Sequence, residues 1–134
     1  MKTKTFLFLI TFGMIITSCD KYNYIHYTME NKTEDSIKIT YSFVKSYFDT
    51  QATDTTVFLK ENQKDTLFIF EQISPTVYDP EEGDKMIYIF NVNTIKLKDN
   101  TNIKKDVSQR KNWIFKETGK NAALMELTIN ESDF

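Results

Sequence analysis

The sequence predicts an all-β domain, and three observations support this prediction. Apolar and polar residues alternate with a period of two in several short runs, which is the pattern of strands that bury one face. Clusters of polar turn-forming residues separate these runs at short intervals. No stretch of the sequence has the apolar spacing of a clear amphipathic helix. About seven or eight such strands are typical of an antiparallel β-sandwich, and we expect an immunoglobulin-like one.

The first half of the chain contains four expected strands. Residues 22–29 are rich in aromatic and β-forming side chains, and residues 37–43 alternate cleanly between apolar and polar positions. Residues 56–60 and 66–71 follow, and the second of these runs is almost continuously apolar. Because strands of this composition fit a pleated, half-buried surface, we expect each run to pair within a sheet.

The second half contains four more expected strands, at residues 86–92, 94–98, 113–116 and 122–130. In the run 94–98 the alternation predicts that Ile95 and Leu97 face inward and that Lys96 and Lys98 face outward. In the last run one face is expected to carry Ala123, Met125, Leu127 and Ile129. Residues 104–112 are expected to form no more than one helical turn.

The N-terminal segment has the order of a secretory signal. Lys2 and Lys4 provide positive charge, an apolar run extends from Phe6 to Ile16, and small residues lead to Cys19, the only cysteine. This segment resembles a bacterial lipoprotein signal, whose lipobox ends in a cysteine that is lipidated and becomes the first mature residue. The resemblance implies a signal peptide at residues 1–18. The apolar run, of about 11 residues, is too short to span a membrane, which needs roughly 20.

Cleavage before Cys19 leaves a mature chain of 116 residues, which is enough for one domain with a single core. We expect residues 19–23 to be the lipidated cysteine and a short tether, and residues 24–134 to be the β-sandwich domain. The short tether places the domain close to a membrane. With Cys19 lipidated, no thiol remains for a disulfide, a thiolate metal site or a cysteine nucleophile. The expected location is the cell envelope, lipid-anchored, at the outer membrane.

Loose features of the mature region recur in a recognisable order. They are a first strand leading to Asn31, then Ser36–Ile39, Lys105-Asp106, a single Trp113 and a closing Leu127-Thr128-Ile129. With the lipobox, this order resembles small Bacteroidetes-type lipoproteins of unknown function. The resemblance implies a β-sandwich on the outer membrane, and it carries over no active-site residue.

Charge is unevenly distributed along the mature chain. Residues 91–120 hold eight basic and three acidic side chains, whereas the mature chain as a whole carries a net charge of −4. We predict a binding surface for an anionic glycan, a phosphate-rich lipid head group or an acidic envelope protein, formed by Lys104, Lys105, Arg110, Lys111 and Trp113. The alternative is that these side chains only solvate outward strand faces. The acidic net charge argues against general nucleic-acid binding.

The segment 79–84 holds four carboxylates in six residues. Oxygen ligands of this kind suit a hard cation such as calcium, and the candidates are Asp79, Glu81, Glu82 and Asp84. Their spacing does not match an EF-hand loop, and acidic turns are common on solvated surfaces. We therefore expect no metal site and no cofactor.

Three tripeptides, which begin at Asp35, Asp54 and Asp65, resemble the Asp-Ser/Thr-apolar signal for O-glycosylation in Bacteroidetes secreted proteins. The acceptor residues are Ser36, Thr55 and Thr66. A glycan at these positions is bulky and solubilising. The alternative is purely local, because Asp followed by Ser or Thr is also how a turn leads into a strand.

The sequence predicts no enzyme. His26 is the only histidine, and no G-x-S-x-G nucleophile motif is present. The first functional hypothesis is a lipid-anchored, non-enzymatic binding or accessory protein of the bacterial cell envelope. The alternative is an inhibitor of a host or rival hydrolase that inserts the loop Asp79–Asp84 into the enzyme's cleft. A hydrolase ranks last.

Overall fold

The structure is a computed structural model that describes residues 21–81 and 83–134. Within this part of the chain the regular elements are seven strands and two short 3-10 turns, and no α-helix occurs. The elements in order are β1 (Tyr22–Lys32), β2 (Ile37–Phe43), β3 (Thr53–Leu59), β4 (Lys64–Ile73), β5 (Ile89–Lys96), η1 (Arg110–Asn112), β6 (Ile114–Gly119), β7 (Ala122–Asn130) and η2 (Glu131–Asp133). The predicted all-β class is confirmed.

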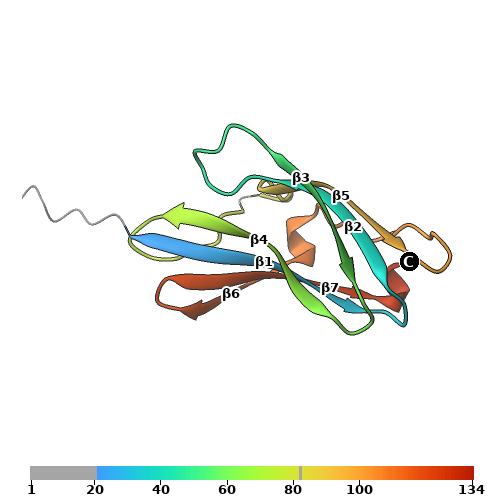
Figure 1. Ribbon diagram of the computed structural model, residues 1–134. Coiled ribbons are helices and arrows are strands. Elements are labelled where there is room, and N and C mark those ends of the chain that lie inside the picture. Colours follow the sequence, from blue (N-terminus) through green and yellow to red (C-terminus); the bar gives the residue numbers. More distant parts are fainter. Residues whose placement is uncertain (1–20, 82) are drawn as a thin grey trace, which may run out of the picture.

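The strands form two sheets that lie against each other as two layers (Figure 1). One sheet has four strands in the order β4-β1-β7-β6, and the other has three in the order β3-β2-β5. Four of the five strand pairings are antiparallel, but β1 and β7 run parallel. The sheets are therefore mostly antiparallel, and this one parallel pair was not specifically predicted. It is sterically simple here because nearly the whole chain separates the two strands, so no tight hairpin has to join them.

The core fills the space between the two sheets. Tyr27 on β1 stacks on Phe68 of β4 at 4.3 Å, and Phe68 stacks in turn on Phe43 of β2 at 4.6 Å between ring centroids. These rings join the two layers. The predicted inward face of the last strand is also confirmed, with fully buried side chains at Ala123, Met125, Leu127 and Ile129.

The strand β5 differs from the prediction in both extent and orientation. Residues 86–92 and 94–98 were expected to form two strands, but one strand spans Ile89–Lys96. Asn91 adopts a positive φ of 52°, and the register against β2 shifts between Thr40 and Ser42. This bulge adds one residue, so the inward positions change from odd to even numbers. The predicted orientation is therefore wrong.

Behind the bulge, Thr94 is buried and Lys96 lies on the inner face of β5, opposite Ile37. Leu97, which was expected to face inward, is exposed beyond the end of the strand. The prediction failed because a period-of-two pattern cannot show a single inserted residue within the strand.

Other boundaries differ by a few residues. β3 begins at Thr53 because it pairs with β2 along its whole length, and β4 extends from Lys64 to Ile73 along β1. The strand expected at residue 113 begins at Ile114. β1 already begins at Tyr22, within the segment expected to be a tether.

The connecting segments gather at two opposite ends of the sandwich. At one end, which we call the N-terminal end, the backbone amides of Ser74 and Tyr24 donate to the carbonyls of Lys21 and Asn121. At the other end, the C-terminal end, the amides of Asn31 and Leu97 bond with the segments 60–63 and 33–36. Figure 1 shows the start of β1 and the C-terminus on opposite sides of the domain.

Candidate functional site

Two residues of the predicted basic surface hold the C-terminus in place. Lys104 Nζ donates to the backbone oxygen of Phe134 at 2.6 Å. Lys105 Nζ donates to the carbonyl of Thr128 at 3.0 Å and lies 3.2 Å from the Asp133 carboxylate. Both cations are therefore engaged in contacts within the chain.

Arg110 and Trp113 also have internal partners. The Arg110 guanidinium pairs with the Asp79 carboxylate and donates to the Trp113 carbonyl at 2.6 Å. Trp113 is only 2% exposed, and its indole Nε1 donates to the carbonyl of Val107 at 2.9 Å. Of the five predicted residues, only Lys104 and Lys111 are exposed. A surface role for Trp113 is contradicted by its position in the core.

The acidic segment 79–84 is divided by the fold. Asp79 turns to Arg110, whereas Glu81 is buried against β1. Glu81 Oε1 accepts a hydrogen bond of 2.6 Å from the hydroxyl of Tyr27. Its two oxygens also accept the backbone amides of Ile87 and Tyr88 at 2.5 and 3.2 Å. One carboxylate thus fixes the loop before β5 to the central strand of the opposite sheet.

Burial raises the pKa of both members of this pair. Desolvation raises the pKa of Glu81 above its ordinary value, although the hydrogen bonds from Tyr27 and the two amides act in the opposite direction. Desolvation also raises the pKa of Tyr27, with the nearby Glu81 carboxylate adding to the effect. The tyrosine therefore remains a hydrogen-bond donor over the whole physiological range.

This geometry does not assemble a metal site. Over residues 21–81 and 83–134, no three histidine, cysteine, aspartate or glutamate side chains converge as ligands. Asp79 and Glu81 have the partners already named, and Glu82 lies outside the described residues. Asp84 contributes its backbone carbonyl, which accepts the amide of Arg110 at 2.9 Å.

The expected modification sites have varied settings. Ser36 and Thr66 each donate their backbone amide to the preceding aspartate carboxylate at 2.8 Å, which is the local turn geometry of the alternative interpretation. Thr55 lies on β3 opposite Tyr41. Use of these positions for O-glycosylation stays a prediction, and Cys19 lies outside the described residues.

The candidate binding site is a shallow polar depression on the outer face of the sheet β3-β2-β5. It has a volume of about 570 Å³ and is lined by Thr40, Tyr41, Ser42, Asp54, Thr55, Thr56 and Asn91. Cross-strand pairing places Asp54 beside Ser42 and Thr56 beside Thr40. The depression therefore presents a carboxylate, an amide and several hydroxyl groups on the three adjoining strands β3, β2 and β5.

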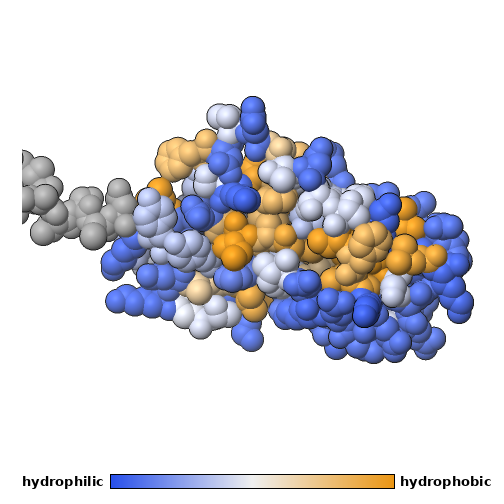
Figure 2. Space-filling model, viewed as in Figure 1, coloured by the Kyte–Doolittle hydropathy of each residue, from blue (hydrophilic) through white to orange (hydrophobic). Residues whose placement is uncertain are grey.

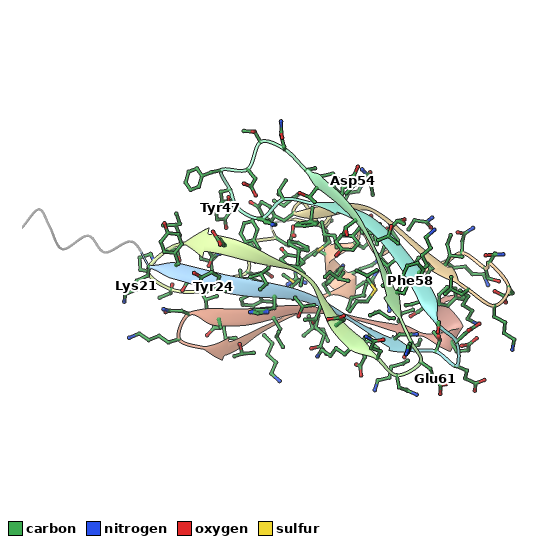
Figure 3. The ribbon with its side chains drawn as sticks, viewed as in Figure 1. Lys21, Tyr24, Tyr47, Asp54, Phe58 and Glu61 are labelled. Carbon is green, nitrogen blue, oxygen red and sulfur yellow. The ribbon has the colours of Figure 1, made fainter. Side chains whose placement is uncertain are left out.

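Hydrogen bonds order the polar groups of the depression. Ser42 Oγ donates to Asp54 Oδ1 at 2.6 Å, and Asn91 Nδ2 donates to Ser42 Oγ at 3.3 Å. Asn91 reaches this position because of its positive φ in the β5 bulge. Phe58, which is 59% exposed, continues the row of outward β3 residues after Asp54 and Thr56 (Figure 3).

Such a surface can recognise a ligand that has both hydroxyl groups and an apolar face. A carboxylate offers about four acceptor sites, of which Ser42 uses one, and an amide both donates and accepts. The sequence did not identify this site. Thr40 and Ser42 were interpreted only as the polar positions of the strand 37–43, and Asp54 and Thr55 only as a glycosylation motif or a turn leading into a strand.

Comparisons with known proteins give no relative for this chain. No family model, no curated protein and no solved structure matches it. None of the helices found in the described ranges is long and apolar enough to cross a membrane.

Proposed function

We propose that this protein is a lipid-anchored, non-enzymatic binding and accessory module of the bacterial cell envelope, and that its ligand is an uncharged glycan. The lipobox-like segment ending in Cys19 supports the anchor and an outer-membrane location. The resemblance to small Bacteroidetes-type lipoproteins agrees with both.

The observation that carries the glycan proposal is the depression on β3, β2 and β5. Sugars offer many hydroxyl groups, and Asp54, Ser42 and Asn91 supply ordered donors and acceptors at hydrogen-bonding distance from one another. Sugars also have apolar C–H faces, and the exposed ring of Phe58 on the same face of β3 suits such contact. The site is open, so a chain longer than one sugar can lie across the sheet.

Charge favours a neutral ligand over the anionic glycan expected from the sequence. The depression contains the Asp54 carboxylate, and no lysine or arginine lines it. An anionic sugar placed there meets like charge in a site that offers no counterion. The basic residues on which the anionic expectation rested are largely committed to internal partners.

The immunoglobulin-like prediction applies to the two-layer architecture of this domain and not to its strand connectivity. An immunoglobulin-like sandwich has two facing sheets in the strand orders ABED and CFG. The orders β4-β1-β7-β6 and β3-β2-β5 share the division into four and three strands, but not the connectivity. We therefore use the term for the layer arrangement alone.

The structure does not favour the loop Asp79–Asp84 as the inhibitory segment of the alternative hypothesis. Insertion into an enzyme cleft needs a segment whose side chains project outward, whereas Glu81 is buried and Asp79 is paired with Arg110. No observation on residues 21–81 or 83–134 favours a hydrolase over a binding module.

Affinity electrophoresis of the mature chain tests the glycan proposal. The gels contain a neutral glucan, mannan or galactan, or the anionic polygalacturonate as a comparison. We expect retardation by at least one neutral polymer. The variant Asp54→Ala should weaken it about tenfold or more, because a hydrogen bond to a charged group contributes about 1.5–3 kcal/mol. Glu61→Ala, an exposed carboxylate at the opposite end of β3, is the matched control. Equal binding by both variants, or retardation by polygalacturonate alone, contradicts the proposal.

The anchor has a separate test. Cells that express the protein are grown with a fatty-acid probe, and the labelled proteins are compared for the natural chain and Cys19→Ala. We expect label only on the natural chain and accumulation of an unprocessed precursor for the variant. Persistent labelling of Cys19→Ala removes the support for a lipid at this position.

A further inference from the structure

We propose that the N-terminal end of the sandwich is a membrane-contact surface whose exposed rings enter the interfacial region of the bilayer. This inference rests on the lipid anchor of the proposed function, and it adds the orientation of the domain. We call the surface the aromatic end, and define it as Tyr22, Tyr24, Tyr47, Phe48, Ile73 and Tyr78.

The aromatic end holds an unusual concentration of exposed apolar side chains. All six residues are exposed, and Phe48 and Tyr22 are the most exposed, at 75% and 51%. They come from three segments that are distant in sequence: the start of β1, the loop after β2 and the end of β4 with its following loop. Isolated exposed hydrophobics need no explanation, but a gathered set indicates an interaction surface.

Specific contacts bring these segments together. Tyr22 pairs with Ile73 across β1 and β4, and the hydroxyls of Tyr47 and Tyr78 lie 2.9 Å apart. The buried side chain of Gln72 contacts both loops, because it exchanges hydrogen bonds of 3.0 and 3.1 Å with the backbone of Tyr78 and its Nε2 also donates to the Tyr47 hydroxyl at 3.4 Å. The loop after β2 is fixed by the amide of Glu71, which donates to the Lys45 carbonyl at 2.7 Å.

Covalent geometry brings a lipid on Cys19 near this surface. Tyr22 follows Cys19 by three positions along the chain. A fully extended chain covers at most about 3.6 Å per residue, so the two Cα atoms lie within about 11 Å of each other in any conformation. A bilayer that holds the acyl chains is therefore adjacent to the start of β1, and Figure 1 shows that the C-terminus lies at the far side of the domain.

The side-chain chemistry fits the interfacial region of a membrane. Tyrosine has an apolar ring and a polar hydroxyl tip, and it is enriched where one end is apolar and the other is wet. Five of the six residues are aromatic, and four of these are tyrosines. The remaining residue, Ile73, and the ring of Phe48 supply purely apolar area.

Charge does not provide the main attraction at this end. The basic side chains of Lys21, Lys45 and Lys120 are nearly balanced by the acidic side chains of Asp49 and Glu71. Attraction to anionic lipid needs a clear excess of lysine and arginine. We therefore expect contact with zwitterionic bilayers as well, and little effect of salt.

The C-terminal end has the opposite character. Its loops form a charged recess lined by Glu34, Asp35, Lys96, Lys98, Asp99 and Glu131. In Figure 2 hydrophilic residues cover the lower part of the half that is farthest from the start of β1, with hydrophobic residues above them. The charged recess is suited to water rather than to a bilayer.

The test uses the full lipidated protein in vesicles of phosphatidylcholine. Two variants, Phe48→Cys and Phe58→Cys, carry a single thiol for a polarity-sensitive fluorophore, because acylation blocks the thiol of Cys19. Phe58 is a matched control that is also highly exposed but lies on the side of the sandwich, on β3. Quenching is measured with spin-labelled phosphatidylcholine, and the emission of buried Trp113 confirms that each variant is folded.

We expect quenching at position 48 to exceed quenching at position 58 by at least about twofold, with a blue-shifted emission at position 48 alone. Equal quenching at the two positions overturns the inference and leaves the anchor intact. Failure of the anchor is recognised independently, because the natural chain then reacts with the thiol reagent and does not float with the vesicles. This result overturns both the lipid anchor and the membrane-contact surface.

Discussion

Glu81 is the residue whose environment departs most from its sequence context. It belongs to an acidic loop, yet its carboxylate is buried and accepts hydrogen bonds from the Tyr27 hydroxyl and two backbone amides. A buried charge is tolerated when hydrogen bonds replace its hydration. The Glu81 side chain therefore helps to position the loop before β5, together with the antiparallel bridge between Lys85 and Gln109.

Replacement of Glu81 should destabilise the domain strongly. Glu81→Ala leaves the Tyr27 hydroxyl and the amides of Ile87 and Tyr88 without their acceptor, and we expect a loss of about 2–4 kcal/mol in the free energy of unfolding. Glu81→Gln keeps an acceptor oxygen and should lose less. Urea denaturation followed by Trp113 fluorescence measures both. Glu61→Ala, at an exposed turn, is the control and should change stability by less than about 0.5 kcal/mol.

The pH dependence of stability follows from the raised pKa of Glu81. The unfolded chain has the ordinary value of about 4.5, and burial raises the pKa in the folded state. The folded state therefore binds the proton more tightly, and this contribution to stability is complete below pH 4.5. It is lost as the pH rises through the folded pKa. Glu81→Gln removes this dependence, so its stability relative to the natural chain should improve between pH 4.5 and neutrality. A constant difference contradicts the assignment.

Single residues also show where sequence analysis reaches its limit. The burial of Ala123, Met125, Leu127 and Ile129 was predictable because a strand with one buried face has a simple period. The positions of Glu81 and Trp113 were not, since both depend on partners 54 and 6 residues away in the chain. The sequence shows that Glu81 has a carboxylate and Trp113 an indole. Only the folded backbone determines that the first accepts from Tyr27 and the second donates to the Val107 carbonyl.

At the scale of elements, β5 shows why strand orientation was mispredicted. The pattern of residues 94–98 correctly indicates extended backbone, and the strand does cover most of that range. The bulge at Asn91 reverses which alternate set faces inward. Its only sequence sign is an asparagine, which tolerates a positive φ better than most residues. The same asparagine also completes the polar depression, so the feature that defeated the prediction contributes to the candidate site.

The C-terminal element η2 gives the basic residues a structural role that can be measured. Lys105 contacts the Thr128 carbonyl and the Asp133 carboxylate, whereas Lys111 is exposed. We expect Lys105→Ala to lower the free energy of unfolding by about 1–2 kcal/mol, since a partly buried cation loses hydrogen bonds. Lys111→Ala should change it by less than about 0.5 kcal/mol. Urea denaturation of the two variants makes the comparison, and equal effects would show that the C-terminal contacts do not stabilise the domain.

At the scale of the whole molecule, the four-stranded sheet is completed by β7, the last strand of the described residues. β7 lies between β1 and β6, and its parallel pairing with β1 joins residues about a hundred positions apart, from Tyr24 with Ala122 to Lys32 with Asn130. Sequence alone predicted the strands but not this order. Strand order depends on which strands pair along their edges in the folded sheet. The alternation of residues within one strand does not show which strand lies beside it.

Removal of β7 should therefore abolish the fold. A chain that stops at Asn121 lacks three large side chains of the core, Met125, Leu127 and Ile129, each of which contributes about 1.5–3 kcal/mol on burial. It also leaves β1 without its parallel partner, whereas a domain of this size is stable by only about 5–15 kcal/mol. We expect no cooperative unfolding transition and a red-shifted Trp113 emission. The control ends at Glu131, keeps all of β7 and should still unfold cooperatively, at a lower urea concentration. A cooperative transition in the shorter chain would mean that the sandwich forms around β1, β2 and β4 without its central parallel strand.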